Sequence, residues 1–434
     1  MAKDINGLKK ISLPILKSRM IKKHLKSDFI KNAFTLIKGS LLAQGISIAI
    51  SPILTRLYAP EDFGLFALYG SIVGVLAVVA TGRYEMAIVL PKKDESAKSL
   101  TKLSLFIAFC FALLLLLLVL CFGDFFTEKL GNPAIKPWLY LVPVSVLVIS
   151  LYNVYNYWCT RSKQYKHLSN SRIVHSTSNG SINLLGGLFN VGPAGLISGQ
   201  FLGFLFSGIY LKIISFGPYK KIENTEISKV LKEYKDFPLK SGLSGLLNIL
   251  ANQLPVMLIG VYFGPIVLGF YALILKVLNL PLTMIGKSVS QVFFQAVSDA
   301  ENNNENTSVL VRSTSIKLFL LIIGPMTILM LFGEELFCFV FGDEWMEAGY
   351  LAKYFALFYI TRFVFYSQSS LFAVKRKLGI ELVLNTTLLI SQVGSIVIGN
   401  IYFTNYVDTF VLMAISGFVM YTIFLISLFK ISKH

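Results

Sequence analysis

The sequence predicts an all-α polytopic membrane protein, with about twelve transmembrane helices in two pseudo-symmetric six-helix lobes around a central cavity. Three observations predict this fold. Only 15% of the 434 residues are charged and 55% are hydrophobic, whereas soluble proteins carry about 25% charged residues. Apolar segments long enough to cross a bilayer recur along the whole chain. Two stretches that lie 205 residues apart are similar in sequence.

The apolar segments are the predicted spans, because about 20 apolar residues in a helix cross the bilayer core. The fifth segment is the most polar, since it contains several Ser and Asn residues together with Arg172 and His175. The twelve segments are 34–57, 63–81, 99–122, 137–158, 168–190, 193–214, 238–262, 267–290, 311–332, 349–373, 380–402 and 408–430.

The positions of Lys and Arg predict the orientation of these spans. With a cytoplasmic N-terminus, 32 of the 40 basic residues fall in cytoplasmic segments. Only Arg56, Lys129 and Lys136 fall in outside loops. This bias indicates that both termini are cytoplasmic. In a membrane protein the location of the basic residues matters more than their sum. The net charge of +17 therefore does not indicate a nucleic-acid partner.

Six spans lie on each side of the longest cytoplasmic segment, and this division predicts the domain organisation. No loop is large enough to form a soluble domain. The predicted parts are a basic cytoplasmic segment (1–33), an N-lobe (34–214), a cytoplasmic linker with helical character (215–237), a C-lobe (238–430) and a cytoplasmic tail (431–434).

The start of the second span resembles the start of the eighth. Residues 56–71, RLYAPEDFGLFALYGS, and residues 260–275, GVYFGPIVLGFYALIL, share a Tyr, a turn with Pro, a Gly and an Ala-Leu pair. Gly64 aligns with Gly269. An even number of spans in each half predicts two parallel halves related by an axis along the membrane normal. Chance similarity between apolar strings is the alternative, and the six-plus-six division favours a real repeat.

Four spans carry a polar side chain every three or four residues, which places these side chains on one face of each helix. Hydrogen bonds between helices would explain isolated Ser residues. Stripes along the whole length of corresponding spans favour a water-filled cavity. The stripes are Ser40, Gln44, Ser47 and Ser51; Arg172, His175, Asn179 and Asn183; Ser241, Ser244, Asn248 and Asn252; and Glu381, Asn385, Gln392 and Ser395.

Charged residues in or near the spans are the strongest functional signal. A Lys or Arg at the centre of a span costs roughly 2.5–3.5 kcal/mol on insertion scales. Lys276 and Lys287 share one helix face, and the repeat makes Lys287 the near-equivalent of Arg83. Snorkelling to the headgroups is the alternative for Arg83 and Lys287. The charged residues are Arg83, Arg172, Lys276, Lys287 and Arg362, with only Glu85 and Glu381 as acids.

A polar cavity with surplus positive charge favours an anion such as a diphosphate, whose oxygens suit Arg and Lys. The predicted substrate-binding residues are therefore the five cations with the amides Gln44, Asn248 and Asn252. The candidates for ion coupling are Glu85, Glu381 and His175. Residues two apart on a helix point to different faces. We therefore expect Glu85 to pair with a cation from another span.

Residues 50–95, ISPILTRLYAPEDFGLFALYGSIVGVLAVVATGRYEMAIVLPKKDE, closely resemble the N-terminal signature of Wzx-type polysaccharide-export flippases of the multidrug/oligosaccharidyl-lipid/polysaccharide exporter superfamily. The LTRLYAPEDFG turn and the GRYEMAI segment are the specific parts. The resemblance covers about residues 34–95, and the remainder fits in span number and charge distribution. It makes Arg83 the best-matched candidate residue.

This resemblance implies a flippase that moves undecaprenyl-diphosphate-linked oligosaccharide repeat units to the periplasmic leaflet of the bacterial inner membrane, for O-antigen (lipopolysaccharide) or capsule biosynthesis. It implies cavity cations that contact the diphosphate or acidic sugars. Its expected partners are membrane lipids, a polysaccharide polymerase and a chain-length regulator. A proton or sodium ion is the candidate coupling ion, and no other cofactor is expected.

Two other functions stay open on the sequence alone. A cation-coupled multidrug exporter of the same superfamily often has a buried carboxylate in its first-lobe cavity, and the first span has none. A membrane polysaccharide polymerase or glycosyltransferase needs a large outside loop or an acidic catalytic pair. The acidic segment 333–347 is the one candidate, and we interpret EELFCFVFGDEW as an interfacial helix anchored by Phe and Trp345. The ATP-binding, zinc-protease and serine-hydrolase motifs are absent from the sequence.

Overall fold

A computed structural model describes residue 35 and residues 38–215, 224–235, 237–303 and 305–433. The predicted basic segment 1–33 lies outside the described residues. The described chain consists of helices and short connections. Eight of its helices are long and apolar enough to cross a membrane, or nine if Pro133–Leu139 and Val142–Arg161 form one bent span. The protein is therefore a multi-pass, all-α membrane protein.

The helices follow one another in two halves. The first half contains an initial helix Lys38–Leu57, then α2 (Pro60–Val79), α3 (Tyr84–Ala87), α4 (Asp94–Lys129), η1 (Pro133–Ile135), α5 (Lys136–Leu139), α6 (Val142–Arg161), α7 (Tyr165–Leu188), α8 (Pro193–Ser215) and α9 (Asn224–Glu233). The second half contains η2 (Phe237–Ser241), α10 (Gly242–Pro281), η3 (Leu282–Gly286), α11 (Lys287–Asn302), α12 (Thr307–Phe341), η4 (Asp343–Trp345), α13 (Met346–Tyr366), α14 (Leu371–Val374), α15 (Leu378–Tyr402) and α16 (Tyr406–Ser432).

Each of the twelve predicted spans overlaps one or more described helices. The seventh span and the first part of the eighth lie within α10, because Gly264 has a φ of 82° and a ψ of 177° and breaks the helix. The side chain of Leu268 then lies against Gly260, so the chain reverses direction at this turn. Helices α7 and α13 are not among the eight helices that are apolar enough to cross a membrane, because Ser, Asn, Tyr and charged residues interrupt their sequences.

Gly64 of α2 and Gly269 of α10 form reciprocal contacts between the two halves. A Cβ atom on Gly64 would lie 1.8 Å from the carbonyl oxygen of Pro265. A Cβ atom on Gly269 would lie 1.9 Å from the carbonyl oxygen of Pro60. Only glycine, which lacks a Cβ atom, permits this approach of two backbones. Since Gly269 follows Gly64, and Pro265 follows Pro60, by 205 residues, the packing of α2 against α10 repeats as the sequence does.

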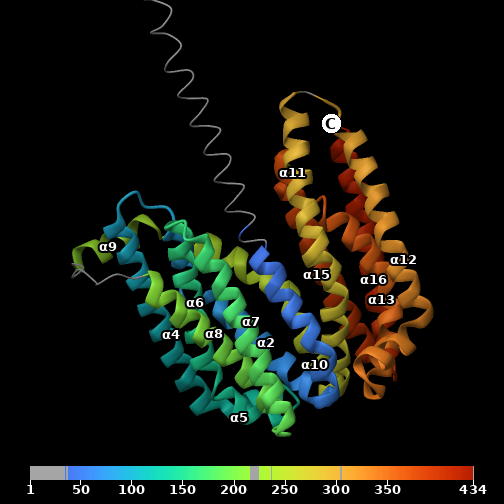
Figure 1. The fold of residues 1–434 in the computed structure, drawn as a ribbon, viewed down its shortest axis with the longest axis horizontal. Coiled ribbons are helices and arrows are strands. Elements are labelled where there is room, and N and C mark those ends of the chain that lie inside the picture. Colours follow the sequence, from blue (N-terminus) through green and yellow to red (C-terminus); the bar gives the residue numbers. More distant parts are fainter. Residues whose placement is uncertain (1–34, 36–37, 216–223, 236, 304, 434) are drawn as a thin grey trace, which may run out of the picture.

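Two groups of helices lie on either side of this α2–α10 contact (Figure 1). The N-side group contains α4, α6, α7 and α8, and the C-side group contains α12, α13, α15 and α16. The groups meet at the end that carries α5 and diverge toward the end that carries the C-terminus (Figure 1). The lobe limits at 34–214 and 238–430 stay a prediction, and α9 lies within the predicted linker 215–237.

Trp345 of η4 links the connection between α12 and α13 to the initial helix and α2. Its indole nitrogen donates a 2.8 Å hydrogen bond to the carbonyl oxygen of Thr55. Its ring packs edge-on against Phe63, with ring centroids 5.0 Å apart. The prediction that Trp345 anchors an interfacial helix is wrong, because the side chain is 0% exposed. Most of the predicted acidic loop instead continues α12 as far as Phe341.

Arg56, near the end of the initial helix, caps the end of α12. Its guanidinium donates hydrogen bonds to the carbonyl oxygens of Phe339 and Val340, at 2.8 and 2.7 Å. Carbonyl groups in the last turn of a helix lack intrahelical partners, so this cap satisfies them. An offset of 205 residues places Val261 at the position equivalent to Arg56. The carbonyl oxygen of Val261 lies near Gly131, which follows the end of α4. Because Val has no side-chain donor, it cannot repeat the cap that Arg56 forms on α12.

Candidate functional site

A central cavity of about 730 Å³ lies between the two groups of helices. The initial helix and α7 line it with their predicted polar stripes, and η3 and α11 complete it. The lining residues with polar side chains are Ser40, Gln44, Ser47, Tyr152, Arg172, His175, Ser176, Thr283, Lys287, Ser288 and Gln291. The structure therefore brings together four of the sequence-predicted site residues: Gln44, Arg172, His175 and Lys287.

Arg172 and Lys287 give the central cavity surplus positive charge. No Asp or Glu is among its lining residues. Neither cation forms an ion pair within the part of the chain that the structure describes. Arg172 donates a hydrogen bond to the hydroxyl of Ser40, and the side chain of Lys287 is exposed. This arrangement can bind an anion by charge-assisted hydrogen bonds.

A second cavity of about 300 Å³, which we call the inner chamber, lies within reach of both halves. Its polar lining consists of Arg83, Glu85, Asn153, Gln200 and Gln253. Phe204 lines both the inner chamber and the central cavity, so the two spaces are neighbours.

Arg83 and Glu85 pair directly, with a nitrogen–oxygen distance of 3.8 Å. Glu85 also accepts a hydrogen bond from the hydroxyl of Thr81. The prediction that Glu85 would pair with a cation from another span is therefore wrong. Gly82 and Arg83 have φ values of 59° and 60°, so the chain here is not a regular helix and the two side chains can meet. Burial raises the pKa of the Glu85 carboxyl, and the hydrogen bond from Thr81 lowers it less.

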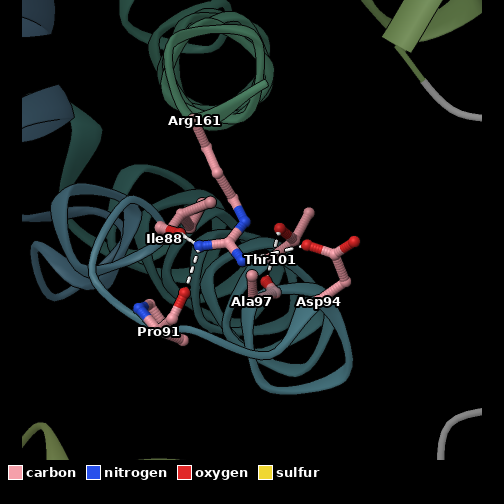
Figure 2. A network of polar contacts seen from close by, with 6 residues as sticks. All are labelled: Ile88, Pro91, Asp94, Ala97, Thr101 and Arg161. Atoms are coloured by element: carbon pink, nitrogen blue, oxygen red, sulfur yellow. Dashed lines mark hydrogen bonds and ion pairs between the residues drawn. The ribbon is translucent and has the colours of Figure 1, made fainter. Parts of the chain in front are cut away.

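Arg161, the last residue of α6, holds the connection that carries Arg83 and Glu85 in place (Figure 2). Its guanidinium donates hydrogen bonds to the carbonyl oxygens of Ile88 and Pro91. It also forms an ion pair with Asp94 at 2.9 Å, at the start of α4. The inner chamber is thus closed by a turn that is fastened to a neighbouring helix.

Arg83 and Lys287 do not occupy equivalent places. After α2 the chain turns sharply at Gly82 and Arg83. In the second half the helix instead continues through η3 into α11, so Lys287 faces the central cavity. Lys276 is partly buried on α10 and Glu381 is partly buried on α15. Neither of these two residues lines any of the three cavities described here.

A third cavity of about 510 Å³, which we call the C-side cavity, contains three more of the predicted site residues. Asn248 and Asn252 of α10 line it together with Arg362 of α13. Asn385 and Gln392 of α15 also line it, so the stripes of the seventh and eleventh predicted spans share this cavity.

Aromatic rings surround Arg362. Its guanidinium carbon lies 5.0 Å from the ring centroid of Tyr359 and 5.8 Å from that of Phe358. It donates a 3.0 Å hydrogen bond to the Tyr359 hydroxyl. No carboxylate pairs with it among the described residues. The positive charge is therefore stabilised by ring faces, which attract cations.

Four lining residues could not be identified from the sequence: Tyr152, Phe204, Gln200 and Gln253. Tyr152 and Phe204 lie among several other aromatic residues of α6 and α8, and Gln253 stands one residue past the predicted stripe that carries Asn252, so no periodic pattern marks them. Gln253 lines both the inner chamber and the C-side cavity. The sequence offers one signal for such a site, which is the isolated amide of Gln200 in the apolar helix α8. An unpaired polar group is costly in lipid, so an amide at this position indicates a polar partner or cavity.

The sequence profile of the family described as "polysaccharide biosynthesis protein" matches residues 53–349. No curated protein matches the sequence.

Solved structures share the fold. A lipid II flippase, MurJ, in an inward closed conformation is 13% identical, with a TM-score of 0.71 over 93% of this chain and 90% of that chain. An inward-facing multidrug resistance MATE family transporter of the MOP superfamily is 15% identical, with a TM-score of 0.69 over 91% of this chain and 94% of that one. An outward-facing MATE family transporter, also 15% identical, has a TM-score of 0.55 over 93% and 96%. The arrangement of helices is thus more similar to the inward-facing form.

Proposed function

Because this chain belongs to the polysaccharide biosynthesis protein family, we propose that it is a transporter that flips undecaprenyl-diphosphate-linked oligosaccharide repeat units across the bacterial inner membrane. The observation that carries this proposal is the pair Arg172 and Lys287, which line the central cavity with no acidic residue beside them. A diphosphate offers the negative charge and acceptor oxygens that such a pair binds.

In the proposed orientation both termini lie in the cytoplasm. The central cavity is lined by the first halves of the initial helix and of α7, Ser40 and Arg172 among them, so in this orientation it lies on the cytoplasmic side. The contacts of Arg56 and Trp345 then close the periplasmic end. The greater likeness to an inward-facing transporter supports this assignment of the conformation.

Transport follows from alternation between two arrangements of the groups. The diphosphate binds Arg172 and Lys287 while the sugars occupy the polar cavity. The prenyl tail stays in lipid and passes between the initial helix and η3, where Leu41, Leu42 and Ile285 are exposed. Rocking of the groups opens the periplasmic end. Cargo that binds one arrangement better than the other shifts the population between them.

A proton or sodium gradient supplies the driving force in this proposal. Of the three candidates Glu85, Glu381 and His175, Glu85 has the most support, because it is buried beside Arg83 in the inner chamber. His175 lines the central cavity. The flipped units pass to a polysaccharide polymerase and a chain-length regulator, for O-antigen or capsule assembly.

The proposal is tested by complementation of a strain that lacks this gene. The variant Arg172→Ala/Lys287→Ala is expected to abolish surface polysaccharide and to leave lipid-linked repeat units inside the cell. The matched control is Arg312→Ala/Lys317→Ala, which removes one Arg and one Lys from exposed positions on α12. Full surface polysaccharide from the cavity variant, at wild-type protein level, would overturn the proposal. Raised drug resistance in a pump-deficient strain, without any effect on polysaccharide, would favour drug export instead.

A further inference from the structure

Phe204 separates the central cavity from the inner chamber. Its ring lies 4.3 Å from the His175 ring and 5.4 Å from the Tyr152 ring, measured between centroids. The preceding residue is Gly203, where a Cβ atom would lie 3.2 Å from the carbonyl oxygen of His175. This glycine lets α8 approach α7 closely. The Phe204 ring is therefore held by packing between two polar spaces.

The inner chamber presents polar atoms that have no partner. Gln200 Oε1 and Arg83 Nε are buried and make no hydrogen bond with any residue that the structure describes. Buried polar atoms in proteins are nearly always hydrogen-bonded. Across the central cavity the same is true of Gln44 Oε1 and His175 Nε2. These four atoms lie in the walls of the two spaces, on either side of Phe204, and are left without a hydrogen-bond partner among the described residues.

Two glycines of α2 lie beside the amides of the chamber. A Cβ atom on Gly70 would lie 3.8 Å from Gln200 Oε1, and one on Gly74 would lie 3.6 Å from Gln253 Nε2. The volume of about 300 Å³ falls at the lower end of the range of small-ligand pockets. The chamber therefore suits a ligand of modest size.

The charges of the two spaces differ. Arg83 in the inner chamber is paired with Glu85, whereas Arg172 and Lys287 in the central cavity have no acidic partner there. The central cavity therefore favours an anion. The inner chamber favours an uncharged ligand with many hydroxyl groups, because its amides can both donate and accept hydrogen bonds.

We propose that the inner chamber is a saccharide subsite with Phe204 as its specificity-determining residue. The sugar next to the diphosphate stacks its apolar C–H face on the Phe204 ring. Its hydroxyl groups bond to Gln200, Gln253 and Arg83, while the diphosphate stays with Arg172 and Lys287. This inference rests on the proposed function, and it adds that the site selects an uncharged first sugar.

The test compares two ligands on the full-length protein in lipid nanodiscs. One is undecaprenyl diphosphate, and the other is undecaprenyl diphosphate that carries one N-acetylhexosamine. Phe204→Leu is expected to raise the Kd of the sugar-bearing ligand about tenfold, which corresponds to about 1.4 kcal/mol. It leaves the Kd of the sugar-free ligand unchanged, and Phe204→Tyr restores binding. Phe206→Leu, at an exposed position on the same helix, is the matched control and changes neither Kd.

Gln200→Met is a second variant that removes the amide and keeps the length of the side chain. It is expected to weaken only the sugar-bearing ligand and to leave the midpoint of thermal unfolding unchanged. Equal effects of Phe204→Leu and Gln200→Met on both ligands, or no effect on either, would overturn the subsite. If Arg172→Ala/Lys287→Ala does not weaken the sugar-free ligand, the proposed function itself fails, which distinguishes the two failures.

Discussion

The backbone of Gly64 packs directly on the carbonyl group of Pro265, and Gly269 packs in the same way on Pro60. We expect Gly64→Ala and Gly269→Ala each to destabilise the protein by about 1–3 kcal/mol, because the added methyl group forces two backbones apart. Gly45→Ala and Gly324→Ala are matched controls, since nothing lies within 4 Å of either position. Thermal unfolding in detergent measures the difference. Equal midpoints for Gly64→Ala and Gly324→Ala would contradict this role.

Arg56→Ala is expected to loosen the closed end beside α12. Hydrogen bonds to a charged group contribute about 1.5–3 kcal/mol, so their loss raises local opening about tenfold or more. Hydrogen–deuterium exchange of amides in 339–346 measures this opening. Lys129→Ala removes an exposed cation elsewhere in the first half and is the control. Unchanged exchange in Arg56→Ala would show that the cap does not hold the end closed.

Glu85 is expected to make stability depend on pH. Burial raises the pKa of its carboxyl above the ordinary 4.5, against the opposing effects of Thr81 and Arg83. The folded state therefore binds the proton more tightly than the unfolded state, and stability falls as pH rises from the ordinary pKa through the raised one. Glu85→Gln is expected to remove this dependence. Unfolding midpoints measured at a series of pH values above the ordinary pKa of 4.5 would refute this if wild type and variant had parallel slopes.

Arg362→Lys is expected to lower both stability and polysaccharide export. Lys lacks the planar guanidinium that stacks between Phe358 and Tyr359, and a desolvated cation–π contact contributes about 2 kcal/mol. Arg312→Lys, at an exposed position, is the control. Wild-type unfolding and export in Arg362→Lys would mean that charge alone suffices at this position.

The spans and the repeat could be predicted because each depends on the local sequence. Twenty apolar residues cross a bilayer in any surroundings. Gly64 and Gly269 stand out because each follows a turn with Pro in a matching stretch. The stripes that carry Gln44 and Arg172 could likewise be found from helical periodicity alone.

Other features could not be predicted, because they depend on how distant segments meet. The pairing of Arg83 with Glu85 requires a left-handed backbone at a non-glycine residue, which the sequence does not mark. Trp345 lies buried because the end of α12 packs against Thr55, 290 residues away in the chain. Phe204 gains its place only from the packing of α8 on α7.

We propose that the absence of a counterpart to Arg56 at Val261 gives opening of this end an order in time. The seam near Val261 has no guanidinium to hold it, so in this proposal it parts first, and the halves tilt about the seam that Arg56 still fastens. Motion then begins as a skewed hinge, although the architecture is duplicated, and the later detachment of Arg56 sets the pace of opening.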